Sequence, residues 1–363
     1  MQSSLSTRLR AFAAGAAQPT VEELAAALDS TFPLAELLTI GEEPRVQFFG
    51  KKIQVHILDN IRNGHCPEDC GYCAQRKSAS AEEIPAYSLK QEEEILKEAE
   101  QAYKSGAYRF CLVTSGTGPT EKQTIKYAEL VKKIKERFPM RLCLSAGIIK
   151  DPKFAEMLAE AGLDRYNHNL NTSAEHTPAI VRTHNFDDRV RTIEHMKRAG
   201  VSVCSGVIVG MGESNQDIAS VAVRLKELDV PSIPVNFFLP VPGHEIDNLR
   251  ELSSEFCLRT LAIFRIANPT AEIRVAAGRE IYLKDKQAEA LRVANSLFVS
   301  GYLNVKGSDA AETYSMIRAN GYQVDAETSD MDPELCKSGS IDQNAMIDSI
   351  EMKTRADLRA FAE

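Results

Sequence analysis

The sequence has no apolar run of the length that a membrane helix needs, and it has no excess of positive charge. A membrane-spanning helix takes roughly 18–20 apolar residues, and no such run occurs in the 363 residues. The net charge of −8 argues against a general nucleic-acid binder, because nucleic-acid backbones attract basic surfaces. The remaining composition, 26% charged and 44% hydrophobic, is that of an ordinary globular protein that can bury a core.

The start of the chain also lacks the apolar core of a secretory signal. Residues 1–20 contain two arginines and no acidic residue, a composition faintly like a mitochondrial presequence. Because the run is short and an acidic helix follows it, we favour a short disordered start to a cytoplasmic protein. Without a secretory signal, the eight cysteines favour metal binding in a reducing compartment over a framework of disulfides.

From about residue 50, short β-rich runs alternate with amphipathic helical runs. Eight runs are expected to be strands: 53–58, 109–115, 141–147, 164–170, 201–210, 232–238, 272–278 and 295–301. Eight β/α units predict an α/β fold, a closed parallel (β/α)8 TIM-type barrel. We expect an N-terminal helical segment (1–45, with helices at 21–28 and 32–38), the barrel (46–325), and a flexible polar C-terminal extension (326–363) with one late helix.

Three cysteines, Cys66, Cys70 and Cys73, have C-x3-C-x2-C spacing in the loop after the first expected strand. In such barrels the carboxyl ends of the strands carry the active site, so this loop belongs at the barrel mouth. A zinc site needs a fourth Cys or His; His65 would be strained as a neighbour of Cys66, although a distant ligand would also complete the site. An iron–sulfur cube held by three thiolates instead leaves one iron open to a small molecule.

Strand alternation predicts a second group of ligands inside the barrel. Bulky apolar residues flank four other side chains, so we expect those four to face the lumen: Cys111, Cys143, Cys204 and Arg274. A single strand cysteine is usually a small core residue, but three in matched phase are harder to explain in that way. A buried arginine needs negative charge beside it, and thiolates with iron-bound sulfide would supply it. Cys257 is expected in the core, and Cys336 is expected to be idle in the polar tail.

The cysteine loop, with Tyr72 before its last cysteine, resembles the signature of the radical S-adenosylmethionine superfamily. Together "GHCPEDCGYCAQ", "YNHNLNTS", "CSGVIVGMGE", "IPVNF" and "AGRE" resemble the biotin synthase family over roughly residues 45–325. The resemblance implies a sulfurtransferase that inserts sulfur into dethiobiotin to form biotin. It also implies a [4Fe-4S] cluster that cleaves S-adenosylmethionine, and a [2Fe-2S] cluster that donates sulfide. The implied ligands are Cys66, Cys70 and Cys73 for the first cluster and Cys111, Cys143, Cys204 and Arg274 for the second.

The same resemblance implies further site residues. Asn169 and Asn171 match positions that contact the nucleoside or the substrate. With Asn167 they make three asparagines in phase, a pattern that favours ligand hydrogen bonds. Some relatives have Asp in place of Asn171, which leaves its ribose contact less certain. The remaining matches are Tyr72 beside the cofactor, Ile208 behind the adenine, Arg189 at the methionyl carboxylate and Asn236 at the ureido ring of the substrate. Arg274 also counts as catalytic, together with the two asparagines.

The resemblance further implies flavodoxin or ferredoxin as electron donor, a homodimer, and no nucleic-acid or membrane partner. Two alternatives remain on the sequence alone. One is a different radical S-adenosylmethionine enzyme, such as a hydrogenase-maturase-like protein, which would not need the three lumen cysteines and Arg274. The other is a non-enzymatic metal-binding regulatory protein, which would not cleave S-adenosylmethionine.

Overall fold

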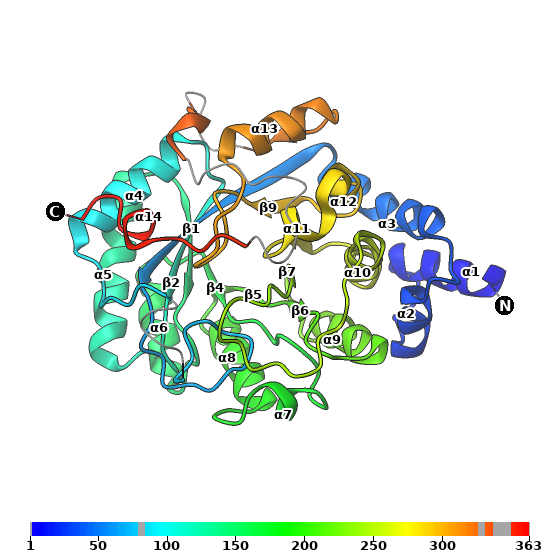
Figure 1. Cartoon of the computed structure of the whole chain (residues 1–363), viewed down its shortest axis with the longest axis horizontal. Helices are drawn as coiled ribbons and strands as arrows, with labels where there is room; N and C mark the ends of the chain where they lie inside the picture. The colour runs from blue at the N-terminus through cyan, green and yellow to red at the C-terminus, as the bar shows by residue number, and fades with distance from the viewer. Residues whose placement is uncertain (1, 79–83, 326–330, 337–349, 363) are drawn as a thin grey trace.

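The computed structural model describes residues 2–78, 84–325, 331–336 and 350–362, which form a parallel β-barrel surrounded by helices (Figure 1). The strand order is β5-β4-β3-β2-β1-β9-β8-β7-β6. Only Ser205 and Gly206 separate β5 from β6, and the Ser205 N–H donates to the Ser232 carbonyl of β7 at 3.0 Å. β5 and β6, the two ends of this strand order, therefore share one strand position. This closes a ring of eight positions and confirms the expected barrel.

Each of the eight runs expected from the sequence contributes to the barrel, and the run 201–210 contributes two short strands. The bounds are β1 Lys52–Arg62, β2 Arg109–Thr114, β3 Arg141–Ser145, β4 Arg165–Asn167, β5 Ser202–Cys204, β6 Val207–Val209, β7 Ser232–Phe237, β8 Glu272–Val275 and β9 Ser296–Phe298. A short strand with no counterpart among the expected ones, β10 Gln323–Val324, pairs with the start of β1 outside the ring.

Helices follow the strands and cover the outer surface of the barrel. They are α4 Glu92–Lys104, α5 Glu121–Arg137, α6 Pro152–Glu160, α7 Thr177–Ile180, α8 Phe186–Arg198, α9 Asn215–Glu227, α10 Ser254–Ala267, α11 Arg279–Leu283, α12 Gln287–Ala290 and α13 Ala310–Ala319. Three of them, α5, α8 and α9, begin with capping boxes, in which the cap side chain and the third helical residue satisfy each other's backbone N–H. Within the described residues no helix has the length and apolar character required to cross a bilayer.

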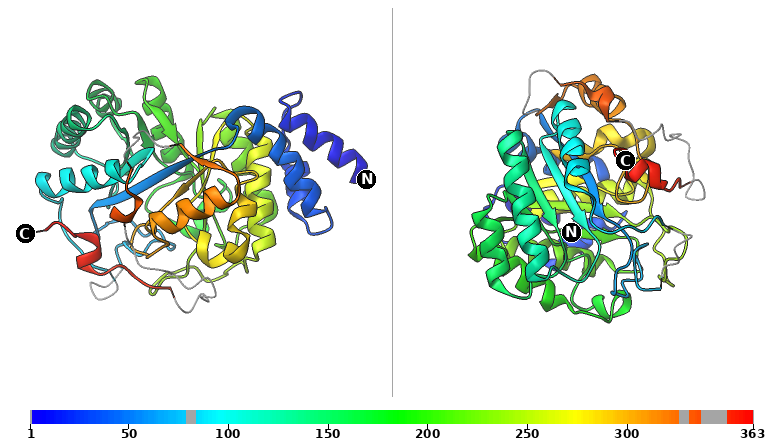
Figure 2. Two further views of the ribbon diagram at one scale, coloured as in Figure 1. Left: turned by 90° about the horizontal axis from the view of Figure 1, so that it is seen from above. Right: turned by 90° about the vertical axis from the view of Figure 1, so that its left-hand side faces the viewer.

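Three helices precede the barrel: α1 Gln2–Ala13, α2 Val21–Leu28 and α3 Leu34–Phe49. They lie at one side of the molecule, where α2 and α3 pack on α9 and α10 (Figure 2). The expectation of a disordered start is wrong, because α1 buries Leu9 and Phe12 in the core. The helix at 21–28 is confirmed, and α3 extends well beyond 38 to Phe49. The proposed domain boundary at residue 45 falls inside α3.

A glycine marks the break between β5 and β6. A Cβ atom at Gly206 would lie 1.8 Å from the carbonyl oxygen of Pro234, so only glycine fits this close approach. The Gly206 N–H donates to the Oδ1 atom of Asn169 at 3.1 Å. The break in the strand therefore fixes the side chain of an asparagine that the sequence places in the site.

The described part of the C-terminal extension crosses from the loop after β9 to α4 (red in Figure 1). Met352 and Val305 form an antiparallel bridge, and the Lys353 N–H donates to the Asn304 carbonyl at 2.7 Å. A short helix, α14 Arg355–Leu358, follows, and Arg359 pairs with Glu94 of α4 at 2.6 Å. Residues 326–330 and 337–349 of the predicted flexible extension lie outside the described residues. Cys336 is described and is not idle: it is buried, with its sulfur 3.1 Å from the Ser105 hydroxyl.

Candidate active site

One cavity of about 310 Å³ lies at the carboxyl ends of the barrel strands. Its walls include the cysteine loop after β1, the ends of β2, β3 and β7, and the loop after β9. Met352 of the C-terminal segment also lines it, from a position far along the chain. The cavity contains almost every residue that the sequence places in the site; Cys204 is the exception, because it lies just behind the wall and contacts Arg274.

The cysteine loop is held in a compact turn. The Cys73 N–H donates to the Cys70 carbonyl at 2.9 Å, and the Gln75 side chain accepts from the Gly64 N–H at 2.9 Å. Burial raises the pKa of the Cys70 thiol to about 11 and that of the Cys73 thiol to about 12, and it also raises the pKa of Cys66. One buried and two partly buried thiols that resist ionisation fit a site completed by a positively charged iron centre, which binds thiolates.

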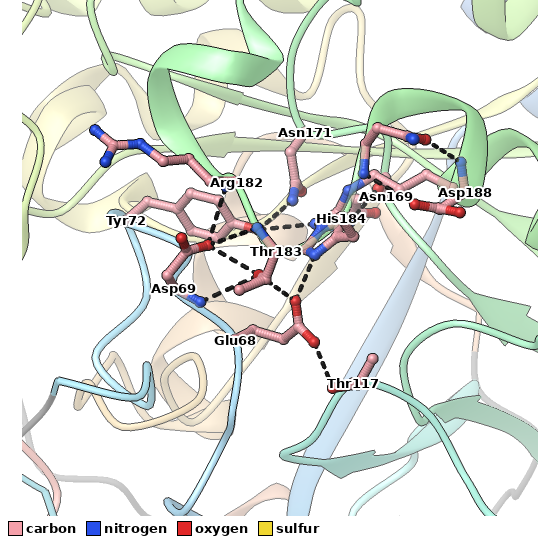
Figure 3. A network of polar contacts seen from close by, with 12 residues as sticks. Glu68, Asp69, Tyr72, Thr117, Asn169, Asn171, Arg182, Thr183, His184 and Asp188 are labelled. Carbon is pink, nitrogen blue, oxygen red and sulfur yellow. Dashed lines mark hydrogen bonds and ion pairs between the residues drawn. The ribbon is translucent and has the colours of Figure 1, made fainter.

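A polar network surrounds this loop (Figure 3). Glu68, between the first two cysteines, accepts hydrogen bonds from the hydroxyls of Thr117 and Thr183 and lies 2.6 Å from the Nδ1 atom of His184. Asp69 accepts from the Thr183 hydroxyl at 2.8 Å. The network joins the loop to the end of β2 and to the segment before α8, so the cysteines are fixed before any ligand binds.

The residues expected around the cofactor gather beside the same loop. Asn171 donates from Nδ2 to the Tyr72 hydroxyl oxygen at 2.5 Å, and Arg189 donates to that oxygen at 3.2 Å. Because its oxygen accepts two bonds, the Tyr72 hydroxyl is left to donate to the Cys70 sulfur, and this bond lowers the pKa of the Cys70 thiol against the larger effect of burial. Asn171 adopts a left-handed backbone with φ of 71°, which asparagine tolerates better than most residues. Ile208 packs in the same apolar cluster as Tyr72 and Cys73, and it also lines the cavity.

The second group lies deeper in the barrel. Cys111 and Cys143 are direct register partners on β2 and β3, and the Nη1 atom of Arg274 lies 3.4 Å from the Cys204 sulfur. The hydrogen bond between the two register partners lowers the pKa of Cys111 despite its burial, and the guanidinium groups of Arg274 and Arg109 act in the same direction. The structure thus brings together all four side chains that strand alternation places in the lumen.

Arg274 is itself held by several acceptors. It donates to the hydroxyls of Ser296 at 3.1 Å and Ser232 at 3.0 Å, and it also pairs with the Glu272 carboxylate. Burial would raise the pKa of Glu272, but Arg274, Arg165 and His56 hold it well below the usual range. Arg165 donates to this carboxylate at 2.5 Å, and the Nε2 atom of His56 lies 3.1 Å from it.

The sequence alone did not predict the charged side chains around Arg274, which include Glu272 and Arg109. Glu272 and Arg109 each lie two residues from a predicted ligand, so the same alternation could have placed both in the lumen. The Nε and Nη1 atoms of Arg109 are buried without a hydrogen-bond partner among the described residues. An orphaned guanidinium beside Cys111 and Cys143 fits a site that receives an anionic iron–sulfide group. The residues present therefore fit both implied clusters.

Asn236 lies on β7, and Asn169 follows β4. Asn236 donates to the Val207 carbonyl at 3.0 Å and accepts from the Ala277 N–H at 3.3 Å, and both asparagines line the cavity. Asn167 donates to the Ser145 hydroxyl at 3.3 Å. In the described part of the chain no three Cys, His, Asp or Glu side chains are grouped closely enough to hold a single metal ion. Cys257 is fully buried, as expected, within α10.

Two family models match the chain. The model of the radical SAM superfamily matches residues 61–225, and the model of the Biotin and Thiamin Synthesis associated domain matches residues 234–323. The first match spans the cysteine loop and the strands as far as β6, and the second spans β8, β9 and α13. The first match ends within α9, and the second begins within β7.

Proteins of known function give a sharper comparison. The biotin synthase of Leptospira interrogans is 52% identical over 315 residues, which is 87% of this chain and 89% of that protein. The biotin synthase of Leptospira biflexa is 54% identical over 297 residues, or 82% of this chain and 84% of that protein. Among solved structures, the FeFe-hydrogenase maturase of Carboxydothermus hydrogenoformans superposes with a TM-score of 0.76 at 18% identity, covering 90% of this chain and 80% of that one. At that identity the likeness shows the fold alone.

Proposed function

The chain belongs to the biotin synthase family, and from that membership we propose how its residues divide the work of converting dethiobiotin to biotin. Members of this family are sulfurtransferases that use S-adenosylmethionine, a [4Fe-4S] cluster and a [2Fe-2S] cluster. The single observation that carries the assignment of residues is the presence of two separate cysteine groups at one cavity. The alternative of a regulatory protein does not account for the deep group or for its arginine.

The upper group, Cys66, Cys70 and Cys73, would hold the [4Fe-4S] cluster. The deep group, Cys111, Cys143, Cys204 and Arg274, would hold the [2Fe-2S] cluster. When bound, these cofactors supply hydrogen-atom abstraction at unactivated carbons and a source of sulfide, chemistry that no amino-acid side chain offers. The protein then has to bind the two organic molecules, orient them and keep water away.

Four residues would bind S-adenosylmethionine beside the upper group. Arg189 offers a cation to the methionyl carboxylate, and Tyr72 and Ile208 provide an aromatic and an aliphatic surface for the nucleoside. Asn171 is held by Tyr72 at 2.5 Å, so its amide is already oriented before the ligand arrives. Preorganised polar groups lose little conformational entropy on binding.

Dethiobiotin would lie between the two groups, with its ureido ring at Asn236 and with Asn169 reaching both it and the nucleoside. Both amides are fixed by backbone partners from β6 and from the loops after β5 and β8. A ureido ring presents N–H donors and a carbonyl acceptor, which the two ends of a carboxamide can match. Arg274 would complete the deep site. Because arginine adds no negative charge, a site with arginine in place of a fourth thiolate is less negative, and this would ease the release of sulfide.

We further propose flavodoxin or ferredoxin as the electron donor, a homodimer, and a cytoplasmic location, all from family membership. The direct test is anaerobic incubation of the reconstituted protein with dethiobiotin, S-adenosylmethionine and a reductant, with detection of biotin by mass spectrometry. Cleavage of S-adenosylmethionine without biotin would favour a different radical enzyme. Iron analysis should give about six irons per fully loaded chain, and a value of about four would contradict the two-cluster assignment.

A further inference from the structure

His184 contacts Glu68 of the cysteine loop (Figure 3), and its other ring nitrogen contacts Arg189. Its Nδ1 atom lies 2.6 Å from a Glu68 carboxylate oxygen, and its Nε2 atom lies 2.6 Å from the Nη2 atom of Arg189. A guanidinium has no acceptor, so Arg189 must donate and Nε2 must accept. Nδ1 therefore carries the proton and donates it to Glu68, which fixes the imidazole in one neutral tautomer.

Electrostatics around the ring agree with this geometry. Burial lowers the pKa of His184, and the nearby Arg189 lowers it further, against the opposing effect of Glu68. The hydrogen-bond order is thus a carboxylate that accepts, a neutral imidazole and a charged guanidinium that donates.

Three of the five N–H groups of the Arg189 guanidinium make hydrogen bonds to the protein. Nη1 donates to the Asn169 carbonyl at 2.9 Å, and the two hydrogens of Nη2 go to the Tyr72 oxygen and to His184. One hydrogen on Nη1 and the hydrogen on Nε have no such bond in the described part of the chain. The guanidinium lines the cavity, so these N–H groups are available to an anionic ligand there.

A neutral acceptor in this place has a specific consequence. If Glu68 bonded Arg189 directly, the ion pair would neutralise the guanidinium and weaken its attraction for an anion. The imidazole bonds both groups, so it fixes the orientation of Arg189 relative to Glu68 while it keeps the guanidinium and the carboxylate apart. Arg189 is then both immobilised and still cationic.

We propose that His184 is a positioning residue, which aligns Arg189 for the carboxylate of a cavity ligand and couples that alignment to the cysteine loop through Glu68. The proposal rests on the proposed role of Arg189 toward S-adenosylmethionine.

The test compares two substitutions of His184. His184→Gln keeps an amide oxygen to accept from Arg189 and an amide N–H to donate to Glu68, whereas His184→Ala removes both bonds. His195→Ala is the matched control, because this histidine lies on α8, the helix that follows His184, and in the described part of the chain its ring bonds the Ile149 carbonyl, at 3.0 Å, and not Arg189. Equilibrium binding of S-adenosylmethionine to the reconstituted protein, and its KM and kcat, are measured for each variant.

We expect His184→Ala to weaken binding of S-adenosylmethionine and raise its KM about tenfold, with kcat changed much less, because one charge-assisted contact loses its alignment. His184→Gln should restore most of the affinity, and His195→Ala should not alter it. Equal losses in the Gln and Ala variants, or an unchanged affinity in His184→Ala, would overturn the proposal. If Arg189→Met also leaves binding unchanged, the proposed role of Arg189 fails instead.

A second readout needs no cofactor. Nitrogen NMR of histidine-labelled apoprotein should show the His184 ring neutral with its proton on Nδ1 at pH 7. Glu68→Gln should keep this tautomer, because the amide oxygen can still accept from Nδ1 and Arg189 still needs an acceptor at Nε2. A proton on Nε2 in the unmodified protein would contradict the hydrogen-bond order on which the proposal rests.

Discussion

Arg274 and Cys204 approach each other from β8 and β5, with a guanidinium nitrogen 3.4 Å from the sulfur. These strands are not neighbours, because β7 lies between β8 and the strand position that β5 and β6 share. The contact therefore crosses the barrel interior, and it directs the arginine toward the cysteines. Ser232, Ser296 and Glu272 hold the guanidinium in this direction.

Arg274→Cys tests what the cation contributes. A fourth thiol should still complete a [2Fe-2S] site, but the added negative charge should slow the formation of biotin in a single turnover. Glu272 keeps Arg165 and His56 as partners in this variant, so its buried carboxylate stays paired. Absorption spectra and iron content verify loading, and an unchanged single-turnover rate would remove sulfide release from the roles of Arg274.

Cys111→Ala tests the deep site by its metal content. The variant should bind about four irons per chain in place of about six, because the upper cysteines are untouched. Cys257→Ala is the matched control: it also removes a fully buried thiol, but from α10, and should keep the full complement. Equal iron content in the two variants would show that Cys111 is not a ligand.

Glu98→Gln should stabilise the apoprotein increasingly as the pH rises. Burial and the neighbouring Asp59 raise the pKa of Glu98 to about 10, and Lys90 only partly offsets them. The folded protein therefore keeps a proton that the unfolded chain loses above about pH 4.5, so this group makes the native state less stable as the pH increases. Glutamine mimics the protonated acid: its amide can donate to Asp59 and accept from Lys90.

Chemical unfolding at pH 5 and pH 8 measures the difference. The variant should gain at least about 1 kcal/mol over the parent at pH 8 and less at pH 5. Glu100→Gln, an exposed position on the same helix, provides the comparison. A gain independent of pH would mean that Glu98 is ionised in the folded protein.

Arg359→Ala should loosen the C-terminal segment at the barrel mouth. The guanidinium makes two bonds to Glu94, at 3.1 and 2.6 Å, which resist movement of the segment more than a single contact would. Amide hydrogen exchange at Lys353, whose N–H bonds Asn304, should accelerate about threefold to fivefold. Arg355→Ala, which removes an exposed charge from α14, should leave this exchange unchanged.

The sequence alone could predict the barrel and both cysteine groups because each depends on local periodicity. Strand alternation put Cys111, Cys143 and Arg274 on one face, and parallel register then brought them together. The first helix has apolar residues at helical spacing, Leu5, Leu9 and Phe12. The basic composition of residues 1–20 favours a disordered start instead, and this conflict explains the wrong expectation there.

Other features had no local signal. His184 and Glu68 are 116 positions apart, and only the folded loop brings them within 2.6 Å. Glu272 reads as the polar start of a strand until Arg165, more than a hundred residues earlier, is seen to donate to it. The C-terminal segment pairs with the loop after β9 through backbone atoms, which side-chain patterns do not encode.

The in-register placement of Cys111 and Cys143 has a practical consequence. Neighbouring strands lie about 4.8 Å apart, and this spacing falls within the range over which two cysteines can be covalently joined. Both thiols are free in the structure. Air exposure of the metal-free protein would convert this pair to a cystine that blocks loading, so purification without metal calls for strictly anoxic buffers or a strong thiol reductant.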